Sequence, residues 1–382
     1  MYPDVSYIFH DLFGTQPDNW LSLFKTFGLL VATAVLSAAF LLQKELERRA
    51  GIGQFTAVPV KVISNAPFDL KDHVFNAVFG FFVGFKIIYI IQYLDEMQND
   101  PSAVLLSLKG SWPGGLVGMI LFIAYYLWED KKRRQAGQQE EMKNLFPHDR
   151  IMDITTVAVV SGIIGAKLFT VIEEPIAFMN DPVGQLFSGD GWTIYGGLIG
   201  GFIGGYFYLK KKNIALLPFL DAVAPALIVS YGVGRLGCHF AGDGDWGIVA
   251  TAQPDWWFLP DWVWSQDYPR NVLNRGVEMA DCIDKYCNHL VPKVYPTAIY
   301  ETFMAFIIGG ILWAIRKPTT AIPGLLFAIY LIFNGMERFL IEGVRVNMKH
   351  DSLGGFTQAE TIAIGLVVIG LVMAVWRWSR SR

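Results

Sequence analysis

A short motif near the middle of the chain combines residues that could bind a phosphate group. It reads GRLGCHFAGDGDWG and spans residues 234–247. Arg235 and His239 are four residues apart, so on a helix they share a face. The glycines that follow allow a tight exit with free backbone N–H groups, and arginine beside such donors suits a phosphate. We expect an anionic ligand here; the alternative is that Arg235 only extends to the membrane interface.

A second charged group lies about 100 residues later in an apolar stretch. The group comprises Glu337, Arg338, Glu342 and Arg345. Arg338 and Glu342 are four residues apart and Glu342 and Arg345 three apart, the spacing at which helical side chains meet. These four residues could form part of a binding site. Alternatively, they only neutralise one another.

A third motif, YPTAIYE at residues 295–301, begins another apolar stretch. Proline at a helix start is ordinary, but Glu301 just inside an apolar span is not, because buried charge needs a partner or a cavity. All three motifs are predicted to lie toward the outer half of a membrane. Two arginine-bearing spans there suggest an anionic lipid headgroup that enters from the outer leaflet.

The composition indicates that lipid surrounds these elements. Of 382 residues, 53% are hydrophobic and only 17% are charged, whereas soluble domains have about 25% charged residues. Apolar blocks of about 20 residues are long enough to cross a bilayer, and they exceed ordinary core-helix lengths, which argues against a large soluble protein. We predict an all-α polytopic membrane protein, a single membrane domain over 1–382. Its predicted spans, about nine, lie near 21–43, 72–94, 112–128, 153–173, 192–209, 217–240, 297–315, 322–342 and 358–378.

The distribution of basic residues predicts the orientation. Every odd-numbered span is followed by lysine or arginine, and cytoplasmic loops are enriched in these residues. We therefore place the N-terminus outside and the C-terminus in the cytoplasm. The first apolar block, 21–42, is too long for a cleavable signal peptide and should remain as an anchor. The basic residues are Lys44, Arg48, Arg49, Lys131, Lys132, Arg133, Arg134, Lys210, Lys211, Lys212, Arg316, Lys317, Arg377, Arg380 and Arg382.

The longest segment between predicted spans, 242–294, is rich in Trp, Pro and Asp, and we interpret it as a small extracytoplasmic cap. It contains Cys282 and Cys287. An oxidising compartment permits a disulfide between them; the alternative is two free thiols. The net charge of -3 gives no support for a nucleic-acid partner.

In order and spacing, these motifs resemble the prolipoprotein diacylglyceryl transferase family. Residues 234–247 resemble its G-R-x-G-N-F-x-N-x-E-x-x-G signature with one extra residue, and residues 195–200, YGGLIG, resemble its H-G-G-L-I-G segment. YPTAIYE resembles H-P-S-Q-L-Y-E, residues 337–345 resemble F-R-x-x-x-E-x-x-R, and residues 162–168 also match. The likeness covers the first span and roughly 153–378.

The resemblance implies a reaction and its participants. A diacylglyceryl group moves from phosphatidylglycerol to the lipobox cysteine of a preprolipoprotein signal peptide, in a bacterial inner membrane, without metal or cofactor. For this reaction we expect catalytic roles for Arg235, Arg338 and Tyr195, and for His239 as the nearest alternative base, one helical turn from Arg235. The resemblance implies substrate contacts from Gly196, Gly197, Gly234, Gly237, Cys238, Gly247, Tyr300, Glu301, Glu342 and Arg345.

Four departures from the family pattern leave other functions open. Tyr195 replaces a histidine, Cys238 replaces an asparagine, Phe27 occupies a tyrosine position, and a pair of spans at 72–128 is inserted. The alternatives are a lipid-binding or transport protein without catalysis and an inactive paralogue. Internal repeats would favour transport, and the sequence shows none. Tyr195 is a poor base at neutral pH but a good donor to phosphate oxygen. We therefore expect Tyr195 to orient the headgroup, while His239 or an arginine-stabilised thiolate supplies the nucleophile.

Overall fold

The computed structural model describes residues 1–99, 101–187, 193–346 and 355–380. The described chain is mostly helical. It divides into two compact units, one formed by Met1–Phe55 with Leu209–Arg382 and the other by Thr56–Tyr208. Each unit is described by itself.

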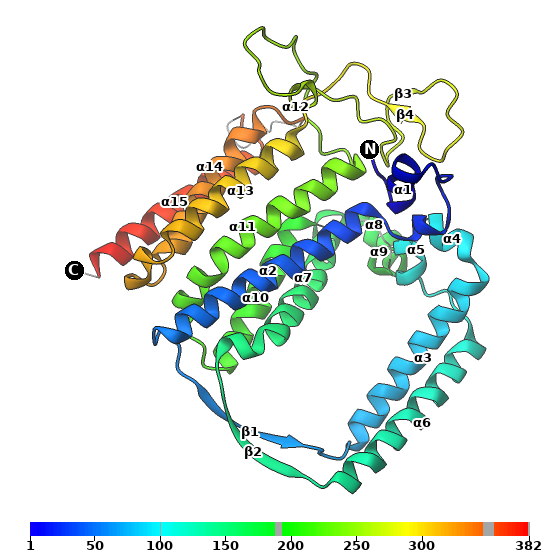
Figure 1. Ribbon diagram of the computed structural model, residues 1–382, viewed down its shortest axis with the longest axis vertical. Coiled ribbons are helices and arrows are strands. Elements are labelled where there is room, and N and C mark those ends of the chain that lie inside the picture. The colour runs from blue at the N-terminus through cyan, green and yellow to red at the C-terminus, as the bar shows by residue number, and fades with distance from the viewer. Residues whose placement is uncertain (100, 188–192, 347–354, 381–382) are drawn as a thin grey trace. The chain divides into compact units, whose positions relative to one another are not determined.

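The first unit is a bundle of long helices. Helix α11 packs along α2 on one side and α13 on another, and α14 packs against α15 (Figure 1). Ile228 of α11, Ala305 and Leu312 of α13, and Leu326 of α14 form a buried apolar core between these helices. The long helices are α2 (Thr26–Gly51), α11 (Leu216–Ala241), α13 (Thr297–Ile315), α14 (Leu325–Glu342) and α15 (Gln358–Ser379). The shorter elements are α1 (Val5–Phe13), η1 (Trp20–Leu23), α12 (Asp261–Trp264), β3 (Val277–Glu278), β4 (Asn288–His289) and η3 (Pro318–Ala321).

A buried ion network holds three of these helices together at one end. Glu45 of α2 pairs with Arg49, whose Nη1 lies 3.7 Å from Asp221 of α11. Asp221 in turn accepts hydrogen bonds from the backbone N–H groups of Gly324 and Phe327 at the start of α14. Buried charges need such partners, and these partners come from different helices, so the network fixes α2, α11 and α14 against one another.

The second unit contains two helix pairs and a β-ribbon. Strand β1 pairs antiparallel with β2, so that Val58 lies opposite Leu145 and Ser64 opposite Gln139. Helices α3 and α6 pack together along their length (Figure 1). The elements are β1 (Val58–Ser64), α3 (Leu70–Gln92), α4 (Leu94–Asn99), α5 (Pro101–Leu106), α6 (Trp112–Ala136), β2 (Gln139–Leu145), η2 (Pro147–Arg150), α7 (Ile151–Glu173), α8 (Pro175–Asn180) and α9 (Pro182–Phe187). Helix α10 (Ile194–Lys211) starts in this unit.

Glycines allow both helix pairs of this unit to pack closely. A Cβ atom added at Gly84 of α3 would lie 2.2 Å from the carbonyl oxygen of Gly114 on α6. One added at Gly165 of α7 would lie 2.3 Å from the carbonyl oxygen of Gly196 on α10. Small residues at such crossings let helix backbones approach in membrane proteins.

Six described helical segments are long and apolar enough to cross a membrane. They are Thr26–Gly51, Leu70–Gln92, Pro147–Glu173, Leu216–Ala241, Thr297–Ile315 and Gln358–Ser379. The other three predicted spans, near 112–128, 192–209 and 322–342, overlap helices α6, α10 and α14; residue 192 lies outside the described residues. The expectation of a polytopic helical membrane protein is confirmed at this level.

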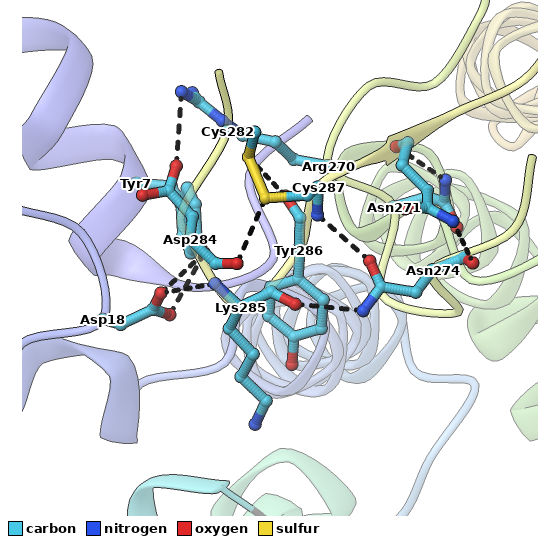
Figure 2. The surroundings of a disulfide bond; sticks show 11 residues. Tyr7, Asp18, Arg270, Asn271, Asn274, Cys282, Asp284, Lys285, Tyr286 and Cys287 are labelled. Carbon is cyan, nitrogen blue, oxygen red and sulfur yellow. Dashed lines mark hydrogen bonds and ion pairs between the residues drawn. A yellow bond between two sulfur atoms is a disulfide. The ribbon is translucent and has the colours of Figure 1, made fainter. Parts of the chain in front are cut away.

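The segment 242–294 folds over the ends of α11 and α13. The Val272 N–H donates to the Ala241 carbonyl, and the Tyr300 hydroxyl of α13 donates to the Val263 carbonyl at 2.8 Å. Within the segment, Cys282 and Cys287 form a disulfide (Figure 2).

Candidate functional site

Arg235 lies on α11 near the end that carries the 242–294 segment, with only 7% of its surface exposed. Beyond Ala241 the chain reverses at Gly242 and Gly244, whose φ angles are 64° and 100°, a backbone conformation that glycine adopts without strain. This reversal returns Asp245 to Arg235, and their side chains form an ion pair.

Glu301 is the meeting point of three arginines. Its side chain on the first turns of α13 is fully buried and pairs with the Arg235 Nε atom of α11. The Nη1 atoms of Arg338 and Arg345 lie 3.4 Å and 3.1 Å from Glu301 Oε1. The structure thus brings together the three charged motifs of the sequence.

Asp245 bridges two of the same arginines. One carboxylate oxygen pairs with Arg235, and the other lies 2.6 Å from Arg345 Nη2. Burial alone would raise the pKa of Asp245, but the two guanidinium groups lower it to about 2. Backbone contacts hold this loop in place, because the Thr297 hydroxyl donates to the Asp245 carbonyl at 2.6 Å. A Cβ at Gly247 would lie 2.5 Å from the Val344 carbonyl oxygen.

Glu342 connects this group to α15. It lies 3.1 Å from Arg338 Nη2 and accepts a hydrogen bond of 2.8 Å from the Thr357 hydroxyl. Glu337, five residues earlier, lies 3.5 Å from the Tyr231 hydroxyl. Helices α11, α13, α14 and α15 therefore all contribute to one polar centre.

We call Arg235, Arg338, Arg345, Asp245, Glu301 and Glu342 the arginine cluster. Its positive and negative charges balance, so an entering phosphate would compete with a carboxylate for guanidinium donors. Arg235 Nη2 is buried and has no hydrogen-bond partner among the described residues. Planar guanidinium groups from separate helices can contact several oxygens of one phosphodiester.

Other predicted site residues lie at the edges of the cluster or outside it. Cys238 Sγ is 3.4 Å from Arg235 Nη1, and a Cβ at Gly237 would contact the Phe27 ring at 3.3 Å. His239 is buried, and its Nδ1 lies 3.4 Å from the Tyr268 hydroxyl of the 242–294 segment. Tyr300 anchors α12 instead of contacting the arginines.

A model of the prolipoprotein diacylglyceryl transferase family matches residues 133–376. The chain belongs to this family. It is 29% identical over 271 residues to a phosphatidylglycerol–prolipoprotein diacylglyceryl transferase of Clostridium tetani. The aligned residues make up 70% of this chain and 95% of that relative. A protein of the same name from Staphylococcus haemolyticus is 28% identical over 285 residues, 73% of this chain and 88% of its own.

The family match begins at residue 133, after most of the α3–α6 pair. It includes α10, where Tyr195, Gly196 and Gly197 lie. In the second unit, Gly196 lies where α10 packs closely against α7, and a Cβ atom added there would lie 2.5 Å from the carbonyl oxygen of Gly165. For this member of the prolipoprotein diacylglyceryl transferase family, the substrate roles of Tyr195, Gly196 and Gly197 stay predictions. The role of Gly234 also stays a prediction; a Cβ atom added there would have no neighbour within 4 Å.

Sequence reasoning missed Asp245 and Thr357 as members or supports of this centre. Asp245 is in the motif of Arg235, but Asp243 two residues earlier is equally acidic, and only the turn decides which carboxylate reaches the arginines. Thr357 caps α15 by accepting from the Glu360 N–H. A threonine before an apolar helix predicts the cap but not the bond to Glu342.

One group of described residues has the composition of a metal site. Potential ligand atoms of Cys238, Asp243 and Asp245 lie within 4.8 Å of one another. Both carboxylate oxygens of Asp245 already pair with arginines, so ion pairing accounts for its position.

Proposed function

We propose that this chain transfers the diacylglyceryl group of phosphatidylglycerol to the lipobox cysteine thiol of preprolipoproteins. The observation that carries this proposal is the convergence of Arg235, Arg338 and Arg345 on Glu301. Family membership and relatives named for this transfer support it.

In the proposed reaction, the thiolate sulfur attacks the glyceryl carbon that bears the phosphate. An S–C bond forms, the C–O bond to phosphate breaks, and its electron pair leaves with glycerol phosphate. Negative charge on the phosphate rises during this step, so nearby guanidinium groups stabilise the transition state more than the bound lipid. Arg235 and Arg338 supply this stabilisation, and Arg345, Glu301 and Glu342 position them.

The thiol proton has two candidate routes in this scheme. His239 accepts it directly, or the guanidinium groups stabilise a thiolate that forms before attack. Tyr195 donates a hydrogen bond to a headgroup oxygen. The contact of His239 with Tyr268, instead of with the cluster, favours the thiolate route.

The membrane arrangement is part of the proposal. Nine helices span a bacterial inner membrane, with the N-terminus and the 242–294 segment outside and the C-terminus in the cytoplasm. The basic residues after alternate spans support this orientation, as does the disulfide in the 242–294 segment, since disulfides persist in oxidising compartments.

The test is transfer of a labelled diacylglyceryl group from phosphatidylglycerol to a lipobox peptide by purified protein. We expect a thioether product with the wild type and a loss of about a hundredfold or more in Arg235→Ala and Arg338→Ala, as for other lost transition-state contacts. Arg275→Ala, at an exposed position of the 242–294 segment, is the matched control.

Three outcomes would contradict parts of this proposal. A wild type without product would refute the transfer reaction. Equal activity of Arg235→Ala and Arg275→Ala would refute the role of the cluster. A fully active Arg235→Lys would exclude a planar two-point contact with phosphate.

A further inference from the structure

A cavity of about 900 Å³ lies between the helix ends and the 242–294 segment. Its apolar floor comes from α11 and α13 and includes Leu236, Ile299, Phe303 and Phe306. Residues 279–284, next to the disulfide, line it from the other side. Its volume is within the range of ligand-binding pockets.

The cavity and the arginine cluster use different faces of the same two helices. Ile299, Phe303 and Phe306 recur at helical spacing on one face of α13, whereas Glu301 is two residues from Ile299, about 200° around the helix. On α11, Leu236 lines the cavity, whereas the preceding residue Arg235 belongs to the cluster. The cavity is thus a second compartment at the level of the cluster.

The charged residues of the cavity disfavour an anionic ligand. Asp11, Asp281 and Asp284 line it together with a single arginine, Arg270. Arg270 already pairs with Asp11 and Asp284, each at 3.6 Å. The amino group of Met1 also lines the cavity and donates to the Pro269 carbonyl. Three carboxylates against these two positive groups still leave a negative balance, which would repel a lipid phosphate and suits an uncharged or basic ligand.

Gln266 indicates that the ligand of the cavity carries a hydrogen-bond donor. It lines the cavity, and its Oε1 atom is buried without a hydrogen-bond partner within the described parts of the chain. An amide oxygen only accepts, and an acyl chain offers no donor. The hydroxyls of a glycerol headgroup could donate, but they are attached to a phosphate that the negative charge of the cavity repels. A polypeptide backbone offers one at nearly every residue.

The wall formed by residues 279–284 is held in place on several sides (Figure 2). The disulfide closes the loop at Cys282 and Cys287. The Lys285 N–H donates to Asp18 at 2.9 Å, and the Cys287 N–H donates to Asn274 at 3.1 Å. A wall fixed in this way gives a ligand a preformed surface.

We propose that this cavity binds an apolar segment of the polypeptide substrate, beside the cysteine that receives the lipid. Leader peptides carry an apolar stretch of about 7–15 residues followed by small residues, and this chemistry matches the apolar floor, the negative rim and the free acceptor. The proposal rests on the proposed function. It divides the substrates between two compartments: the phosphodiester binds the arginine cluster, and the peptide binds the cavity.

The test measures KM separately for the lipobox peptide and for phosphatidylglycerol. Gln266→Leu removes the acceptor and Phe303→Trp reduces the cavity; we expect each to raise the peptide KM about fivefold or more and to leave the lipid KM unchanged. Gln253→Leu, on an exposed glutamine of the same segment, and Ile307→Trp, on an exposed position of α13, are the matched controls.

A second measurement does not depend on catalysis. A lipobox peptide with a photoreactive benzophenone in its apolar stretch should label residues 299–306 or 279–284 of the wild-type protein. Variants that raise only the lipid KM would assign the cavity to an acyl chain and overturn the proposal. Unchanged KM values for both substrates, or labelling elsewhere, would also overturn it. If the wild type forms no thioether, the proposed function fails, and the labelling still decides whether the cavity binds peptide.

Discussion

Asp245 connects Arg235 and Arg345, which are 110 positions apart in the chain. Its pKa of about 2 lies below the ordinary value of 3.8, because two guanidinium groups favour its ionised form despite burial. A carboxyl group with a lowered pKa stabilises the folded state above its unfolded pKa. That stabilisation is lost only as the pH falls from about 4 toward 2.

We predict that Asp245→Asn lowers the transfer rate about tenfold or more, because a charged hydrogen-bond partner of two arginines is lost. Asp245 is ionised from pH 5 to 9, so the ratio of wild-type to variant rates should be constant over this range. A pH–rate profile of both proteins measures it, with Asp255→Asn as the control. A ratio that changes across this range would show that Asp245 titrates during the reaction.

The residues of the cluster were largely predictable, but their arrangement was not. Arg235, Glu301, Arg338, Glu342 and Arg345 stand out because charge in an apolar span is costly. Their contacts depend on how α11, α13 and α14 pack, and spacing within one helix reveals only neighbours three or four residues apart. Glu301 and Arg235 are 66 positions apart, so their ion pair could not be read from the sequence.

At the scale of elements, glycine determines how closely α3 and α6 pack. The Cβ of Gly84→Ala would lie 2.2 Å from a backbone oxygen of α6, so the helices would have to separate. We predict a destabilisation of about 1–3 kcal/mol, as in other overpacked interiors. Hydrogen exchange of the α3 and α6 amides measures this effect.

Gly205→Ala on α10 is the control, because a Cβ there meets nothing within 4 Å. The same added methyl group should leave exchange unchanged or slow it, since alanine favours helix. Equal effects of the two substitutions would mean that backbone approach does not limit the α3–α6 contact.

The long helices were predictable, but the β-ribbon was not. Apolar blocks of spanning length indicate helix directly, and every predicted span coincides with a helix. Strand β2 reads QEEMKNL, and six of its seven residues are exposed. It lacks the alternation that indicates a half-buried strand. Its conformation depends on pairing with β1. The paired residues are at least 75 positions apart in the sequence, as for Ser64 and Gln139.

At the scale of the whole molecule, orientation in the membrane is the feature most open to a direct test. We predict that a reporter fused after Lys212 is cytoplasmic and one inserted within 250–290 is extracytoplasmic, because basic residues follow alternate spans. Paired enzymatic reporters active on opposite sides of the membrane measure this. Exchanged activities at the two positions would refute the orientation.

The register of the β-ribbon brings together the two ends of the segment that contains α3 and α6. Val58 pairs with Leu145, so the segment between them starts and ends at neighbouring positions of the second unit. Everything from α3 to α6 is therefore a detachable module, bounded by two ends that a short turn could join. The same two ends are natural joints for transplanting the hairpin into another membrane protein.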